Sequence, residues 1–218
     1  MYYSIFNQFD SILADERRSA LHSDLDPNYA QNTHISLSSL QEIINPDKKT
    51  FDKYVDKLEK PEEAFAGPGD PYDGNPAFEE YFDNLKIDVQ AAERLRSYYA
   101  WYSQYVGKGK DYELNFILWV DENDIPACYL VLCNFTSGTN EIEMLEVLPH
   151  CKGTGLGSQI FRYAVQHFDI NRLDVYPDNK VALNMYKKNG FGITVESKRA
   201  YDAGETDKYV MVRIFKKK

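Results

Sequence analysis

The stretch from Glu146 to Ser158 constrains the fold of this chain more than any other segment. It begins as an apolar, strand-like run that stops at Pro149, and apolar residues at helical spacing begin again at Ile160. Between these two patterns, glycine occupies three alternate positions: Gly153, Gly155 and Gly157. Alternating glycines let the backbone turn sharply with its N–H groups aimed at one point, and the free N–H groups and dipole of a helix start attract an anion there. The segment therefore predicts a strand, an anion-binding turn and a helix, in that order.

The first half of the sequence has the periodicity of helices. Ser39 and Glu42 have the spacing of a capping box, and the dipeptide Asn-Pro at the head of residues 45–60 repeats the start signal of a helix. Residues 66–74 are dense in turn-forming residues and predict a loop. A longer helix follows over 76–106, with an aromatic stripe that is more typical of a core than of a ligand site.

After this long helix the periodicity changes to that of strands. The predicted elements are strands over 114–120, 128–135 and 141–148, a helix over 153–167, a strand over 172–176, a helix over 181–188, and a final pair of strands over 193–199 and 208–215. Strands that alternate with helices and end in a hairpin predict a mixed α/β sheet in one domain.

Charge and hydropathy narrow the class of partner. Residues 1–100 hold 19 acidic against 10 basic residues, whereas residues 101–218 hold 15 of each, so the excess negative charge is in the first half. Such a field repels nucleic acid and attracts cations. No apolar run approaches the roughly 20 residues that cross a bilayer, and the first ten residues lack the features of a signal peptide. We therefore expect a cytoplasmic protein that binds neither nucleic acid nor membranes.

The cysteines and histidines predict neither disulfides nor a metal site. The three cysteines are odd in number, and Cys128 and Cys133 lie five apart in a strand, so that their side chains point to opposite faces. We expect buried, inert thiols. The four histidines lack the short spacings to Cys or carboxylates that mark zinc sites.

Two familiar phosphate-binding motifs do not fit the glycine turn. A Walker loop ends in Gly-Lys-Ser/Thr, whereas Gly157 precedes Ser158-Gln159, and the dinucleotide fingerprint needs one more residue between its second and third glycines. The turn resembles the pyrophosphate loop of the GNAT superfamily of N-acetyltransferases, Arg/Gln-x-x-Gly-x-Gly/Ala, at Lys152-Gly153-Thr154-Gly155-Leu156-Gly157. Lys152 departs from the family pattern, because a lysine keeps the charge but lacks the planar fork of arginine.

A second segment strengthens the resemblance. Residues 173–191 look like the family's next strand, its Asn, and the helix that carries Ala, Tyr and Gly-Phe. The resemblance covers about residues 113–215. It implies that residues 111–218 form an acetyl-CoA-binding core, a twisted and mostly antiparallel sheet flanked by helices. The mainly helical residues 1–110, which match no family motif, are then expected to contribute to the acceptor site of the same domain.

The resemblance also implies which residues bind acetyl-CoA. Backbone groups of the strand before the turn bond the pantetheine arm like an added strand, and the turn holds the pyrophosphate. The implied residues are Leu145, Glu146 and Val147 on the strand, Lys152, Gly153, Thr154, Gly155, Leu156, Gly157 and Ser158 in the turn, and Asn179 beyond it. Without a ligand contact, Asn179 is an ordinary helix cap.

For catalysis, the resemblance places Tyr186 at the position of the family's general acid. A phenol suits this role because its pKa, about 10, is not far above that of a thiol, so it can protonate a departing thiolate. The other interpretation is that Tyr186 belongs to the core, since apolar residues accompany it on the same helical face.

The general base is less constrained by the sequence. The two-residue period of a strand puts Glu141 and Glu143 on one face and Glu146 on the other. Asp174 occupies the position at which the ribosomal-protein N-terminal acetyltransferases of this superfamily carry a catalytic glutamate, although it is one methylene shorter. We rank Glu143 and Asp174 first as bases, with a structural role as the alternative for each.

These residues predict an N-acetyltransferase that transfers an acetyl group from acetyl-CoA to a small cationic amine or a peptide amine. Transfer is expected to be direct, within a ternary complex, since the thiol of Cys151 precedes the phosphate loop and does not lie beside the thioester. The alternative is a non-catalytic acyl-CoA-binding module with an N-terminal partner-binding surface. The sequence leaves open the acceptor, the length of the acyl chain and the oligomeric state, a homodimer included.

Overall fold

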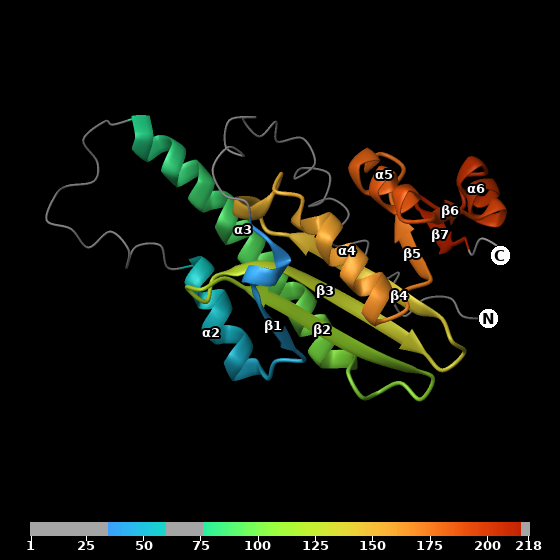
Figure 1. Ribbon diagram of the computed structural model, residues 1–218, viewed down its shortest axis with the longest axis horizontal. Coiled ribbons are helices and arrows are strands. Elements are labelled where there is room, and N and C mark those ends of the chain that lie inside the picture. The colour runs from blue at the N-terminus through green and yellow to red at the C-terminus, as the bar shows by residue number, and fades with distance from the viewer. Residues whose placement is uncertain (1–34, 60–75, 215–218) are drawn as a thin grey trace, which may run out of the picture. The chain divides into compact units, whose positions relative to one another are not determined.

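The computed structural model describes residues 35–59 and 76–214 of the 218-residue chain, so the loop predicted over 66–74 lies outside the described residues (Figure 1). The described elements are the 3-10 turn η2 (Leu37–Ser39), β1 (Gln41–Ile44), α2 (Lys48–Glu59), α3 (Pro76–Tyr105), β2 (Tyr112–Val120), β3 (Pro126–Phe135), β4 (Asn140–Val147), the 3-10 turn η4 (Pro149–Cys151), α4 (Leu156–His167), β5 (Arg172–Val175), α5 (Lys180–Lys188), β6 (Phe191–Ile193), α6 (Val195–Asp202) and β7 (Tyr209–Arg213).

The strands form one seven-stranded sheet in the order β1-β2-β3-β4-β5-β7-β6. All neighbouring strands are antiparallel except β4 and β5, which are parallel. The expected mixed, mostly antiparallel α/β fold is thus confirmed, and the single parallel pair marks the centre of the sheet.

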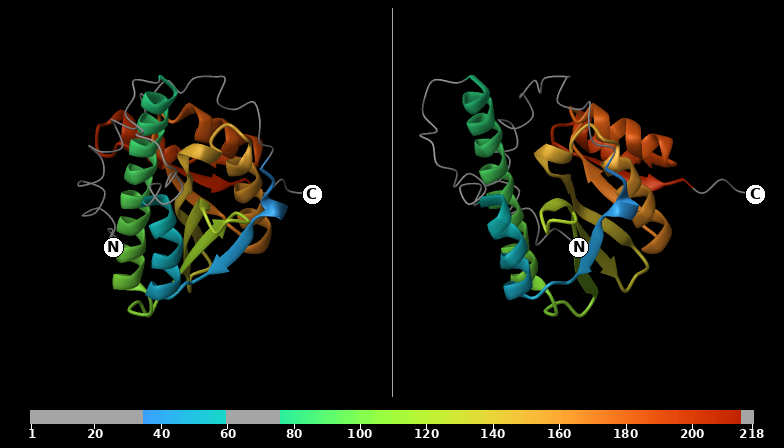
Figure 2. Two further views of the ribbon diagram at one scale, coloured as in Figure 1. Left: turned by 90° about the vertical axis from the view of Figure 1, so that its left-hand side faces the viewer. Right: turned by 60° about the vertical axis from the view of Figure 1, so that its left-hand side comes forward.

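One face of the sheet packs on helices α4 and α5 (Figure 2). Ile160 and Phe161 of α4 and Leu183 of α5 are buried against alternate strand residues such as Leu130 and Leu173. Burial of apolar surface is worth about 25 cal/mol per Å², so this cluster contributes much of the stability of the fold. It also fixes the start of α4 against the sheet.

The opposite face packs on α2 and α3 through an aromatic cluster (Figure 2). The ring of Phe116 on β2 lies 5.9 Å from that of Phe51 and 5.5 Å from those of Tyr99 and Tyr102. All four residues are buried. The interpretation of the aromatic stripe as core is therefore confirmed for the residues of this cluster.

The helix start predicted from Ser39 and Glu42 is wrong. Residues 41–44 form the edge strand β1, in which Glu42 pairs with Trp119. The pairing is extended beyond the strand by Asn45, whose side-chain oxygen accepts a hydrogen bond from the N–H of Phe116 at 2.8 Å. Long-range strand pairing outweighs the local capping signal here, because it satisfies backbone groups of both strands.

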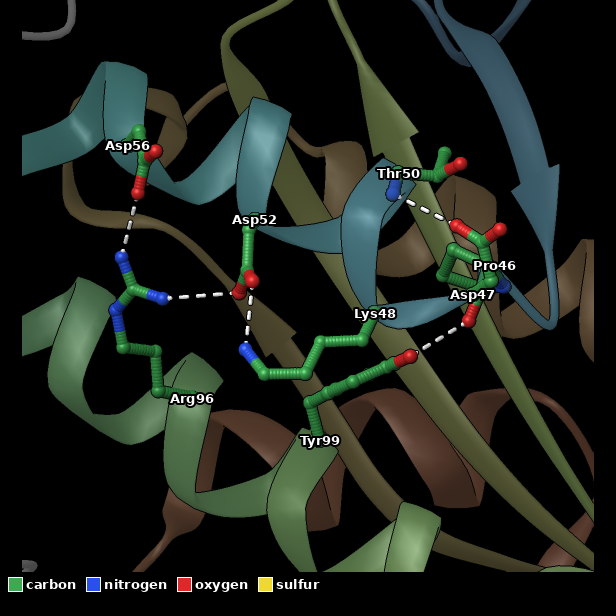
Figure 3. A network of polar contacts seen from close by, with 8 residues as sticks. All are labelled: Pro46, Asp47, Lys48, Thr50, Asp52, Asp56, Arg96 and Tyr99. Carbon is green, nitrogen blue, oxygen red and sulfur yellow. Dashed lines mark hydrogen bonds and ion pairs between the residues drawn. The ribbon is translucent and has the colours of Figure 1, made fainter.

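Helix α2 consequently begins later than the Asn45-Pro46 signal, and its cap is Asp47. The N–H of Thr50 donates to Asp47 Oδ1 at 2.7 Å (Figure 3). The carbonyl group of Pro46 instead accepts a hydrogen bond from the hydroxyl group of Tyr99 at 2.8 Å, and Arg96 lies between Asp52 and Asp56 (Figure 3). These contacts join α2 to α3.

The strand predicted over residues 193–199 is mostly a helix. Only Phe191–Ile193 forms β6, and α6 begins at Val195. The side chain of Thr194 caps this helix by accepting from the N–H of Ser197 at 3.2 Å. A Thr cap followed by an acidic first turn is a helix start signal that the apolar alternation concealed. The predicted pairing with the last strand is confirmed, but only through β6.

Candidate active site

Strands β4 and β5 pair only at their beginnings. Glu141 lies opposite Arg172 and Ile142 opposite Leu173, and no further pairs join the two strands in the described chain. Beyond this point β4 continues to Val147 paired with β3 alone, while β5 continues paired with β7. The β5-facing edge of β4 therefore presents backbone groups to which an extended ligand can bond as an added strand.

The glycine-rich turn lies at the far end of this free edge. Gly153 and Gly155 have φ angles of 80° and 82°, in the left-handed region that disfavours other residues. Thr154 tightens the turn, since its hydroxyl group donates to the carbonyl oxygen of Cys151 at 2.8 Å. The third glycine packs next to the end of β4, since a Cβ on Gly157 would lie 3.4 Å from Val147 Cγ2, in van der Waals contact.

The backbone N–H groups of this turn are available to a ligand. Within the part of the chain that the structure describes, those of Gly153, Thr154, Gly155 and Gly157 donate to no protein acceptor. They surround the N-terminus of α4, which adds its dipole. Lys152 is exposed beside them. The arrangement fits a pyrophosphate group, with the backbone as the main source of contacts.

A β-bulge changes which side chains of β4 share a face. Met144 pairs with Val131 and Ile142 with Leu132, so Glu143 is an extra residue on β4. Glu141 and Glu146 then pair with Cys133 and Tyr129, which lie four apart on β3. Glu141 and Glu146 therefore share a face, and the prediction that put Glu146 on the opposite face is wrong, because one inserted residue shifts the two-residue alternation.

Glu146 is held by three hydrogen bonds. Arg94 of α3 donates to its Oε1 from Nε at 3.0 Å and from Nη2 at 2.8 Å, and the hydroxyl group of Tyr129 donates to Oε2 at 2.6 Å. The side chains of Glu146 and Arg94 are only 17% and 18% exposed. The carboxylate of Glu146 thus joins β4 to α3, and the cofactor contact predicted for this residue, which uses its backbone, stays a prediction.

Glu141 is the carboxylate that the sequence ranking underrated. It is 8% exposed and lies where β4 and β5 begin to separate. Arg172 Nε is 3.7 Å from its Oε2, which makes an ion pair without a hydrogen bond. Burial raises the pKa of Glu141 to about 7, against the opposing effect of Arg172 and with a further increase from the nearby Asp174. No spacing in the sequence signals this burial, which depends on the tertiary fold.

The other two predicted carboxylates are more accessible. Asp174 lies two residues after Arg172 on β5 and is exposed, and its charge acts on Glu141. Glu143, at the bulge, is half-buried. The structure therefore brings Asp174 and Glu141 into one electrostatic neighbourhood, and it places Glu143 next to Glu141 on the strand that lines the opening.

Tyr186 lies on the buried face of α5. Its ring is 8% exposed and lies 4.8 Å from that of Phe161, so the side chain is part of the core. Burial raises the pKa of Tyr186 to about 12. Its hydroxyl oxygen bonds to no residue of the described chain and is not among the fully buried polar atoms that lack a partner. The ring is thus fixed by packing while the hydroxyl group stays accessible.

Asn179 is the N-cap of α5, since its Oδ1 accepts from the N–H of Ala182 at 3.0 Å. The three cysteines are free and buried, as expected. In the described residues no group of three His, Cys, Asp or Glu side chains could hold a metal ion. None of the described helices is both long and apolar enough to cross a membrane.

Comparison with known proteins agrees with this geometry. The model of the Acetyltransferase (GNAT) family matches residues 76–191, which is more than half of the chain. Similar solved structures include the Campylobacter jejuni N-acetyltransferase PseH in complex with acetyl coenzyme A, which is 18% identical, covers 79% of this chain and 96% of that chain, and has a TM-score of 0.39. No curated protein sequence matches.

Two further structures show the range of the similarity. A chimera of the Vibrio cholerae spermidine N-acetyltransferase SpeG and hSSAT is 12% identical, covers 80% of this chain and 95% of that chain, and has a TM-score of 0.44. Ard1 from Thermoplasma volcanium is 24% identical, covers 47% of this chain and 71% of that chain, and has a TM-score of 0.36.

Proposed function

Because the chain belongs to the GNAT acetyltransferase family, as the match over residues 76–191 shows, we propose that it transfers an acetyl group from acetyl-CoA to a primary amine. The observation that carries this proposal is the separation of β4 from β5, which ends at the glycine-rich turn. A free strand edge and an anion site, placed end to end, suit a donor that has an amide-containing arm and a pyrophosphate.

The donor would be held chiefly by backbone groups. The turn N–H groups from Gly153 to Gly157, with Lys152 at the rim and Ser158 in the first turn of α4, would bind the pyrophosphate. The backbone of Leu145, Glu146 and Val147 would bond the pantetheine arm. From Glu143 to its end at Val147, β4 advances by four residues, or about 13 Å, so the thioester would lie where β4 and β5 converge. Asn179 would add a side-chain contact.

We assign the departing thiolate's proton to Tyr186. With a pKa raised to about 12, its phenol stays protonated at neutral pH and acts only as a donor until negative charge develops on sulfur. The fixed ring and accessible hydroxyl group support this role, because the oxygen can approach a ligand without a change of rotamer.

We assign the amine's proton to a carboxylate at the point where the strands separate. Glu143 and Asp174 remain candidates, and Glu141 joins them. Its pKa of about 7 suits a base at neutral pH, whereas an ordinary carboxylate is a weaker acceptor. In the proposed step the amine nitrogen bonds to the acetyl carbon, the carbon–sulfur bond breaks, the carboxylate takes a proton from nitrogen and Tyr186 protonates sulfur.

The acceptor would approach past residues 1–110, while residues 111–218 would form the donor-binding core. The excess negative charge of the first half favours a small cationic amine or a peptide amine over an anionic acceptor. Attack within a ternary complex needs no acyl-enzyme, and the buried position of Cys151, before the turn, supports that route.

The test is acetyl-CoA consumption with a panel of amines, together with calorimetry of coenzyme A binding. We expect the Tyr186→Phe variant to lose about 10²-fold in kcat while its affinity for coenzyme A stays unchanged. Coenzyme A binding without turnover on any amine would favour the alternative, a non-catalytic acyl-CoA-binding module. A folded protein without affinity for coenzyme A would contradict both.

A further inference from the structure

A pocket of about 520 Å³ lies between η2, the start of β1 and one flank of α4. Ligand pockets usually have volumes of about 300 to 1,000 Å³, so this one is large enough for a small molecule. Its helical wall consists of four α4 residues at helical spacing: Gln159, Arg162, Tyr163 and Gln166. In Figure 2 the segment that contains η2 runs beside α4. The glycine turn does not line this pocket, which is therefore separate from the donor site.

The wall of η2 is fixed against the helix. The backbone N–H of Leu37 donates to Gln159 Oε1 at 3.0 Å, which links η2 to α4 across 122 residues of sequence. A backbone group held by a side chain in this way gives the pocket a preformed shape. Preformed sites bind ligands at a lower cost in ordering.

Glu42 brings a partly unsatisfied carboxylate to the pocket. Its Oε2 accepts a hydrogen bond from the hydroxyl group of Tyr163 at 3.0 Å, but its Oε1 is buried and has no donor in the described part of the chain. Burial, followed by the neighbouring Glu42, raises the pKa of Tyr163 to about 12, so this phenol remains a donor. A buried oxygen without a donor costs about 1 to 3 kcal/mol, and a ligand N–H group would remove that cost.

Arg162 supplies the opposite charge. It is exposed on α4 and forms no ion pair within residues 35–59 and 76–214. Glu42 and Arg162 thus line one pocket without pairing with each other. Two opposite charges that line the same cavity, neither of which has a charged partner among the described residues, match a ligand that carries both charges.

Apart from Ser36 and Ser38, the remaining wall is apolar and aromatic. Trp119 lines the pocket and is otherwise buried, and its ring lies 6.0 Å from that of Tyr163 in an edge-on arrangement. Leu37 and Leu40 complete the apolar lining. Aromatic faces attract an ammonium group, and the leucines offer a surface for an apolar side chain.

We propose that this pocket binds a small zwitterion of the amino-acid type. Its ammonium group donates to Glu42, its carboxylate pairs with Arg162, and its side chain lies against Trp119 and Leu40. This binding site does not depend on acetyl transfer, so the proposal can be tested separately from the proposed function.

The test is calorimetry of the full chain with the proteinogenic amino acids. Each amino acid is compared with the matching amine, which lacks the carboxylate, and with the matching acid, which lacks the amine. We expect at least one amino acid to bind, with both partial analogues weaker by about tenfold or more. Glu42→Gln and Arg162→Gln should each weaken binding by a similar factor. Glu196→Gln and Arg199→Gln, which change exposed residues of α6, are the matched controls and should leave binding unchanged.

Coenzyme A affinity, measured on the same variants, shows that each variant is folded. If Glu42→Gln does not bind coenzyme A, Arg162→Gln still tests the proposal, because Arg162 is exposed and its substitution should not disturb folding. The proposal is overturned if no amino acid binds at millimolar concentration, if the amines bind as well as the amino acids, or if neither substitution weakens binding. Competition between the amino acid and coenzyme A would also overturn it, since the ligand would then lie in the donor site.

Discussion

The two ends of β4 carry carboxylates on the same face of the sheet, and these carboxylates are in opposite states. Near the end of the strand, Glu146 receives three hydrogen bonds from Arg94 and Tyr129. Near its beginning, Glu141 is buried more deeply, yet its partner Arg172 is 3.7 Å away. A carboxylate whose oxygens are fully hydrogen-bonded serves to hold structural elements together. A buried carboxylate with few partners has a perturbed pKa and can serve as a proton acceptor in a reaction.

The position of each carboxylate explains this division. Beyond Ile142, β4 has no β5 neighbour, so the link from Glu146 to α3 replaces part of the lateral support that the strand lacks. Glu141 lies where the two strands still pair and needs no such support. We therefore expect changes at the Glu146 end to alter stability and donor binding, and changes at the Glu141 end to alter the chemical step.

The largest expected effect is that of Glu141→Gln on turnover. Removal of a general base lowers rates by about 10² to 10⁴-fold, and the nearly isosteric amide should leave coenzyme A affinity unchanged. In the wild type, kcat/KM should rise as pH increases through about 7, because the base acts only when deprotonated, and the variant should lose this inflection. Steady-state kinetics over a range of pH measure both effects.

Glu143→Gln and Asp174→Asn are the matched controls for that substitution. If the division between the two ends of β4 is right, each of these variants should lower kcat less than Glu141→Gln does. Each should also retain the inflection of kcat/KM near pH 7. A loss at Asp174 that exceeds the loss at Glu141 would move the base to β5.

The next effect, on stability, is expected at the other end of the strand. Glu146→Ala removes a carboxylate that accepts hydrogen bonds from the partly buried Arg94 and the buried Tyr129, and breaking a buried pair costs about 3 kcal/mol. Denaturant unfolding should show this loss. The control is Asp56→Ala, which removes an exposed partner of Arg96 and should cost less than about 1 kcal/mol. Equal losses in the two variants would mean that the Glu146 contacts are no stronger than those of a surface pair.

Glu141 should also make stability depend on pH. Its pKa is raised from about 4.5 to about 7 on folding, so the native state holds a proton that the unfolded chain releases. This stabilisation is fully present below the unfolded pKa and is lost as pH rises through the folded pKa. Relative to Glu141→Gln, the wild type should therefore lose on the order of 2 kcal/mol of unfolding free energy between about pH 5 and about pH 8. A constant difference over that range would contradict the raised pKa.

The contrast within β4 also separates what the sequence could predict from what it could not. The turn from Gly153 to Gly157 was predictable because glycine placement and helix start are local properties. The states of Glu141 and Glu146 were not, because they depend on a bulge at Glu143 and on a partner, Arg94, 52 residues away in the sequence. The same limit explains the error at β1, where pairing with β2 outweighed a local capping signal.

The smallest expected effect concerns the glycine-rich turn that follows β4, and it separates the role of this turn in coenzyme A binding from its role in stability. Gly155 has a φ of 82°, and the left-handed region costs other residues about 1 to 2 kcal/mol. Gly138, in the turn between β3 and β4, has a φ of 88°, and a Cβ at either glycine would meet no atom within 4 Å. Gly155→Ala and Gly138→Ala should therefore lower stability by similar amounts. Only Gly155→Ala should weaken coenzyme A binding, by about tenfold, since the N–H groups of its turn would have to realign. Calorimetry on both variants measures the difference, and equal coenzyme A affinities would mean that the turn does not bind the pyrophosphate.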